Sequence, residues 1–339
     1  MAIWVGMSIA AAFLQNLRSS LQKRLTARLS TQGATATRFL YGLPFALIWL
    51  GIVFAGSNAP WPEANLRFVS MAAIGGIAQI AGTALLIATF SHGSFAVGTT
   101  YSKTEGIQTA AFGYLFLGDR VSAGGLVGVV LTVLGVVSVS LRRSGAAAGV
   151  STSTSASTAT GTTGTGTSVG AGAGVGTGAG AESARGPIAA PDRRVQVIAM
   201  GLLSGAMFAV SAVCYRGASL ALGDGHFLLR AAFTLVFALG VQSALTALGL
   251  GIFQPGELTR VRRAWRAGLL AGASGAGASA CWFTAFTLVN ASYVKAVGSV
   301  ELVFAVLSSW LLFRERPSPT ELAGVALVML GVVVTVTMH

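Results

Sequence analysis

The sequence contains very little charge. Only 9% of its 339 residues are Asp, Glu, Lys or Arg, whereas 53% are hydrophobic and the mean hydropathy is +0.74. A soluble globular protein carries about 25% charged residues, because its surface must be solvated. The same figures exclude a disordered chain, a collagen and a coiled coil. We therefore predict an all-α integral membrane protein that crosses the cell membrane several times. In a bacterium this would be the inner membrane.

Cysteine and histidine are also scarce, and this limits the chemistry. Cys214 and Cys281 fall in different hydrophobic segments without a Cys-x-x-Cys, while His92, His226 and His339 fall in loops or at the terminus. A disulfide scaffold and a metal site are not expected. No His-Glu-x-x-His, Gly-x-Ser-x-Gly or Walker-type glycine loop occurs. We predict neither an enzyme nor an ATP-driven pump, and no cofactor.

Ten hydrophobic segments have about the 20 residues that a transmembrane helix needs. They are 2–22, 35–56, 66–90, 94–117, 121–141, 195–220, 226–252, 264–288, 292–313 and 317–338. Between the fifth and sixth segments, residues 144–181 contain no charge, aromatic or proline, only Ser, Thr, Gly, Ala and three Val. Such a composition buries too little surface to fold. We predict a flexible linker over 142–194 between units 1–141 and 195–339.

The two units repeat one another at a constant offset of 196 residues. The matches span two hydrophobic segments and their connecting loop: Glu105 with Glu301, Leu115 with Leu311, Arg120 with Arg316, Ser122 with Ser318, Leu126 with Leu322, Gly128 with Gly324, Leu134 with Leu330 and Gly135 with Gly331. With five spans per unit, the second copy must enter the membrane upside down relative to the first. The sequence therefore predicts ten transmembrane helices arranged as two inverted five-helix repeats.

The loop charges define a direction across the bilayer. The odd-numbered loops, including the linker, hold 14 Lys and Arg, whereas the even-numbered loops hold only Arg67, Arg120 and Arg216. The positive-inside rule then places the odd loops in the cytoplasm and both termini outside. The net charge of +12 is thus an orientation signal, and it gives no reason to expect nucleic acid as a partner.

The end of each unit resembles the drug/metabolite transporter superfamily, specifically its ten-span EamA-type exporters. The segments are YLFLGDRVSAGGLVGVVLTVLGVVSVS and WLLFRERPSPTELAGVALVMLGVVVTV. Both are similar to the family pattern of an apolar span, a Gly-Glu-Arg-like turn, a Leu-x-Gly and a later Leu-Gly-Val-Val. The matching residues are Gly118, Asp119, Arg120, Leu126, Gly128, Leu134 and Gly135, and Arg314, Glu315, Arg316, Leu322, Gly324, Leu330 and Gly331.

This sequence departs from the family pattern in three respects. The family often has Glu-Pro in the fourth and ninth spans, where this chain has Gly106 and Leu302 after the glutamates, and the usual Trp-Gly of the first span is missing. Family members often have both termini in the cytoplasm, which disagrees with the loop charges of this chain. The resemblance implies an exporter fold, and amino acids or related amines as cargo.

Three charged residues lie deep within the predicted spans: Lys103, Glu105 and Glu301. At the centre of a transmembrane helix each charge costs about 2.5–3.5 kcal/mol, so these side chains must face a cavity or one another. Other charged residues lie near span ends, where long side chains reach the interface: Arg18, Arg38, Arg230 and Lys295.

The two carboxylates of Glu105 and Glu301 outnumber the single ammonium group of Lys103, which leaves one carboxylate in excess. Such a group could carry a proton or neutralise a cationic substrate, and the alternative is a structural Lys103–Glu ion pair with the other Glu permanently protonated. The residues one helical turn from Glu105 predict a polar cavity wall: Tyr101, Ser102, Gln108 and Thr109. The neighbours of Glu301 are small or apolar, so we expect a more isolated carboxylate there.

Further candidates lie on the first, third and eighth spans. Gln15 and Arg18 belong to a polar stripe with Ser8 and Gln22, and Trp282 could stack on a substrate. Gln79 and Thr83 mark the third span, and each of these polar residues could equally hold helices together. The glycines of the eighth span, Gly268, Gly272 and Gly275, predict close helix packing.

We predict a secondary transporter that exports a small polar metabolite of the amino acid or amine class by alternating access. Proton antiport through Glu105 or Glu301 is the expected coupling. The alternative is a pH-independent facilitator or exchanger for a sugar or nucleotide conjugate, followed by a non-transporting membrane scaffold. The expected partners are a small-molecule substrate, protons and the lipid bilayer, and the sequence leaves a homodimer open.

Overall fold

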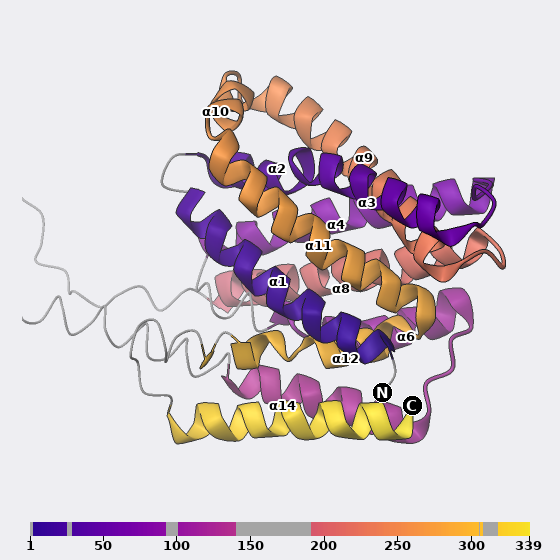
Figure 1. Cartoon of the computed structure of the whole chain (residues 1–339). Coiled ribbons are helices and arrows are strands. Elements are labelled where there is room, and N and C mark those ends of the chain that lie inside the picture. Colours follow the sequence, from indigo (N-terminus) through magenta and orange to yellow (C-terminus); the bar gives the residue numbers. More distant parts are fainter. Residues whose placement is uncertain (1–2, 26–28, 93–100, 140–190, 305, 308–317) are drawn as a thin grey trace, which may run out of the picture.

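A computed structural model describes residues 3–25, 29–92, 101–139, 191–304, 306–307 and 318–339. All regular elements among these residues are helices (Figure 1). Most of the predicted linker, the start of the fourth predicted span and the second part of the ninth lie outside the described residues. Six helical stretches among the described residues are long and apolar enough to cross a membrane, so the all-α membrane class is confirmed, whereas the full set of ten is described only in part.

The helices follow the predicted hydrophobic segments closely. For example, α9 covers Phe227–Phe253 and α11 covers Trp265–Leu288, where the sequence predicts 226–252 and 264–288. The remaining elements are α1 (Ile3–Leu25), α2 (Thr31–Leu40), α3 (Gly42–Ser57), α4 (Leu66–His92), α6 (Glu105–Leu117), the helix Ala123–Val139, α8 (Pro191–Ala221), α10 (Glu257–Arg263), α12 (Ala291–Gly298) and α14 (Pro319–Met338).

The second predicted span bends where it meets the eighth. It consists of α2 and α3 with a turn at Tyr41, because Pro44 has no N–H to donate to the carbonyl of Leu40. Tyr41 fits against Gly268 and Gly272 of α11, where any larger residue would collide with its ring or backbone. Its hydroxyl donates to the carbonyl oxygen of Val261 at 3.0 Å. These glycines serve helix packing, as the sequence predicts.

Both ends of the chain lie at one end of the bundle, as Figure 1 shows. The ring of Trp4 in α1 lies 5.2 Å from that of His339, centroid to centroid. At the opposite end, the backbone N–H of Ser30 donates to the buried Glu257 carboxylate at 2.6 Å, which joins the loop after α1 to α10. Within the bundle α1 packs along α11, and α4 packs along α8.

Two repeat-equivalent helices, Ala123–Val139 and α14, cross in opposite directions. A Cβ added to Gly128 would lie 2.8 Å from the carbonyl oxygen of Gly331, and one added to Gly135 would lie 2.8 Å from that of Gly324. In the repeat, Gly128 corresponds to Gly324 and Gly135 corresponds to Gly331. The two contacts therefore join equivalent positions, each glycine of one helix meeting the counterpart of the other glycine. The reversed order of the contacts means that the helices run antiparallel, as inversion of one repeat requires.

A half-buried ion pair closes the end of the bundle that carries the termini. Arg216 of α8 donates through Nε to Asp119 Oδ2 at 2.7 Å and through Nη1 to the carbonyls of Phe286 and Val289 at 2.9 and 2.6 Å. It also donates to Asn290 Oδ1 at 3.2 Å. The sequence interpretation that treats Arg216 as a loop residue is wrong, because its hydrophobic helix continues past it to Ala221.

Replacement of Gly128 by Ala should destabilise the protein. The added methyl group meets backbone atoms of α14, and crowding of this kind costs about 1–3 kcal/mol. The control is Gly240→Ala in α9, where an added Cβ meets nothing within 4 Å and the helix should gain up to about 1 kcal/mol. Thermal unfolding in detergent measures both variants, and equal melting temperatures would contradict the tight crossing.

Replacement of Arg216 by Met should lower stability strongly. The change leaves the Asp119 carboxylate and two carbonyls without their donor, and a polar group left without its partner costs about 1–3 kcal/mol. The matched control is Arg67→Met, because Arg67 is an exposed arginine near the start of α4. Unfolding of the detergent-purified variants should rank Arg216→Met well below both the control and the wild type.

Candidate functional site

The fourth and ninth predicted spans are both interrupted, at repeat-equivalent positions. In the first unit a turn at 103–104 precedes α6, which begins at Glu105. In the second, a turn at 299–300 follows α12, and helix resumes at Glu301. The turns are tightened by i to i−3 hydrogen bonds, from Thr104 N to Tyr101 O at 3.2 Å and from Val300 N to Val297 O at 3.1 Å. Each interruption thus places a glutamate at the start of a helical segment.

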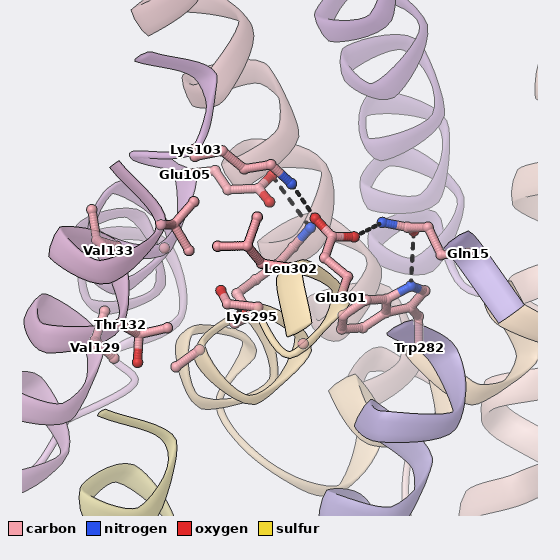
Figure 2. A pocket seen from close by; sticks show the side chains of 15 residues that line it. Gln15, Lys103, Glu105, Val129, Thr132, Val133, Trp282, Lys295, Glu301 and Leu302 are labelled. Carbon is pink, nitrogen blue, oxygen red and sulfur yellow. Dashed lines mark hydrogen bonds and ion pairs between the residues drawn. The ribbon is translucent and has the colours of Figure 1, made fainter. Parts of the chain in front are cut away.

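These interruptions bring together two ion pairs that join the units (Figure 2). Lys103 of the first unit pairs with Glu301 of the second, and Lys295 of the second pairs with Glu105 of the first at 3.4 Å. The four side chains are between 19% and 37% exposed, so they are accessible from within the bundle. Each unit therefore supplies the ammonium group for the carboxylate of the other.

Gln15 and Trp282 hold Glu301 from the opposite side. Gln15 of α1 donates from Nε2 to Glu301 Oε2 at 2.6 Å and accepts from Trp282 Nε1 of α11 at 3.2 Å. The ammonium nitrogen of Lys295 lies 5.4 Å from the centre of the Trp282 ring, within the range of a cation–π interaction. Figure 2 shows this chain of contacts from Lys103 through Glu301 and Gln15 to Trp282.

We call the cavity around these residues the charge pocket. It has an empty volume of about 550 Å³, which includes space open to solvent. Charged and polar side chains line one side, while Val129, Thr132 and Val133 of the helix Ala123–Val139 line the other. The pocket thus offers groups of both charges together with an apolar wall.

Lys295 is the residue that the sequence interpretation missed. It is expected to extend to the membrane interface, yet it lines the charge pocket and pairs with Glu105. The inference of one excess carboxylate is therefore wrong for this site, which holds two ammonium groups and two carboxylates. The repeat contains the missing signal, since Ser299 aligns with Lys103 and Lys295 lies one helical turn before Ser299.

The polar residues around Glu105 do not line the charge pocket, and two of the four contact α8. The Ser102 hydroxyl lies 3.5 Å from that of Ser204, and Gln108 Nε2 donates to the carbonyl of Leu202 at 3.3 Å. Thr109 is buried and donates to the carbonyl of Glu105. Tyr101 is half-buried and does not line the described pockets. The turn at 103–104 separates Tyr101 and Ser102 from the helix that begins at Glu105.

Arg18 also lies apart from the charge pocket. It is only 9% exposed, and its stem lies beside that of Arg38 over Gly275 of α11. Both arginines are predicted to extend to the interface, but the structure places them inside the bundle. Within the described part of the chain, no group of three or more His, Cys, Asp or Glu side chains could hold a metal ion.

Comparison with known proteins gives one family and one fold. Residues 2–141 and 196–337 match the EamA-like transporter family. A search of curated proteins finds no match. One solved crystal structure is similar over 99% of this chain and 97% of its own, with a TM-score of 0.69 and 14% identity, which supports the fold alone. The chain therefore belongs to the EamA-like transporter family: it is a non-enzymatic, multi-pass membrane protein of the drug/metabolite transporter superfamily, and it transports small molecules.

Proposed function

We propose that this protein is a secondary transporter that exports a small polar metabolite of the amino acid or amine class by alternating access. Residues 1–141 and 195–339 act as two inverted five-helix bodies, joined by 142–194, that rock around the charge pocket. The observation that carries the proposal is the pair of crossed ion pairs, Lys103–Glu301 and Lys295–Glu105. These pairs contact both bodies at their two interrupted helices.

The ion pairs supply the coupling in this proposal. Movement of one body against the other stretches both pairs, and a separated ammonium or carboxylate in a water-poor cavity is costly. A proton on Glu105 or Glu301 releases the facing lysine, and so does a substrate ammonium group that takes its place. Gln15 holds the second oxygen of Glu301 while the lysine leaves. We propose protons as the counter-transported ion for this reason.

A pH-independent facilitator or exchanger is the second candidate. It is favoured by the charge balance of the pocket, since each carboxylate already has an ammonium partner and neither needs a proton. Exchange of one polar solute for another would then release the lysines without proton transfer. The two candidates differ in their response to an imposed pH gradient.

Glu105→Gln and Glu301→Gln should abolish gradient-driven transport. We expect the flux of radiolabelled phenylalanine and putrescine into proteoliposomes under a pH gradient to fall by about tenfold or more, because glutamine cannot bind the coupling proton. The control is Glu63→Gln, an exposed carboxylate between α3 and α4. Wild-type flux that ignores the gradient supports the facilitator, and full gradient-driven flux in both pocket variants refutes coupling through these carboxylates.

A reporter at the C-terminus should show an external terminus. Alkaline phosphatase fused after His339 is expected to be active, because the loop charges place the end of the bundle that carries both termini outside the cytoplasm. A green fluorescent protein at the same position serves as the paired measurement and should stay dark. If the green fluorescent protein fusion is fluorescent and the phosphatase fusion is inactive, the C-terminus lies in the cytoplasm and the predicted orientation is wrong.

A further inference from the structure

Two neighbouring arginines inside the bundle have no carboxylate partner among the described residues. Arg18 of α1 is 9% exposed and Arg38 of α2 is half-buried. A Cβ added to Gly275 would lie 3.2 Å from Arg18 Cδ and 3.4 Å from Arg38 Cγ, so the two stems are neighbours. Among the described residues, neither guanidinium forms an ion pair, and the Nε atom of each is buried without a hydrogen-bond acceptor.

The charges of this region do not balance. Lys103 and Lys295 neutralise Glu105 and Glu301, which leaves the two arginines as an excess of two positive charges inside the bundle. The charge of Arg38 repels that of Arg18, and Glu301 attracts Arg18 more weakly from beyond ion-pair distance. A buried guanidinium without a counter-charge is costly and retains donors that an acceptor would satisfy. The missing component has negative charge and accepts hydrogen bonds.

A second cavity adjoins Arg38, and we call it the arginine pocket. It has an empty volume of about 410 Å³ and shares Gln15, Trp282 and Lys295 with the charge pocket. The hydroxyl groups of Ser211, Tyr215 and Ser279 line it together with Gln79. Its apolar surface consists of aromatic rings, from Phe208, Trp282, Phe283 and Phe286. A guanidinium, hydroxyl groups and rings together suit a solute with an oxyanion head and an apolar body.

We propose that Arg38, supported by Arg18, binds the oxyanion group of the transported molecule, a carboxylate or a phosphate. Planar guanidinium groups recognise both by parallel hydrogen bonds. The aromatic rings of the arginine pocket receive the body of the solute, and Lys295 lies where this pocket meets the charge pocket. The proposal rests on the proposed transport function and restricts its cargo to molecules that carry an anionic group, so a simple amine does not suffice.

The test measures binding without any gradient. Thermal unfolding of the full-length protein in detergent is followed with phenylacetate, phenyl phosphate and benzylamine, which have one ring in common and differ in the head group. We expect phenylacetate or phenyl phosphate to raise the melting temperature of the wild type, and benzylamine to leave it unchanged. The stronger of the two anions identifies the head group. Preference for benzylamine, or no effect of either anion at millimolar concentration, overturns the proposal.

Variants locate the site. Arg38→Gln should weaken anion binding by about tenfold or more through loss of a charged donor, and Arg18→Gln should weaken it less. The control is Arg262→Gln on α10, an exposed arginine that lines neither the charge pocket nor the arginine pocket and should bind as the wild type does. Unchanged binding by Arg38→Gln refutes the assignment.

The stability of the ligand-free variant separates binding from a structural role. Because Arg38 has no carboxylate partner among the described residues, Arg38→Gln should melt at or above the wild-type temperature while it loses the anion. A lower melting temperature together with lost binding assigns Arg38 a structural role and overturns the proposal. If Arg38 binds the anion but the protein transports nothing, the proposed transport function is refuted and the binding site stands. If the protein transports a solute but Arg38→Gln binds the anion as the wild type does, the binding site is refuted and the transport function stands.

Discussion

A charge inside a membrane needs a counter-charge, and this constraint explains the centre of the molecule. Lys103 and Lys295 each neutralise a glutamate of the opposite unit, so these four charges stay paired only while the units face each other. The two interrupted helices follow from the same constraint, because their turns are the positions where backbone and charged side chains face a cavity and not lipid. The same four residues thus form the site and join the two units at its centre.

The ends of the helices are the part of the fold that the sequence predicts best. Hydrophobic length and loop charge locate α8, α9, α11 and α14 to within a few residues, because the bilayer imposes a nearly fixed length on any helix that crosses it. The bend at Tyr41 was not predicted, although Pro44 signals it. A window that averages hydropathy detects length and does not detect a single missing hydrogen-bond donor.

The site was harder to predict, because helical spacing assumes an unbroken helix. That assumption places Ser102 on the same face as Glu105, whereas the turn at 103–104 separates the two and Ser102 lies against Ser204 of α8. It also leaves Lys295 at a span end. Distance along the chain is a poor measure of depth when a helix stops and restarts, and only the three-dimensional arrangement shows which charges meet.

The crossing of Ala123–Val139 and α14 has a consequence for how the units recognise each other. Gly128 contacts Gly331, and Gly135 contacts Gly324. Each unit therefore contacts the other through the same pair of repeat-equivalent positions. In oligomers such a self-complementary contact is called isologous and is typical of two-fold symmetric dimers. Within this single polypeptide, the two repeats therefore associate as the subunits of a homodimer do.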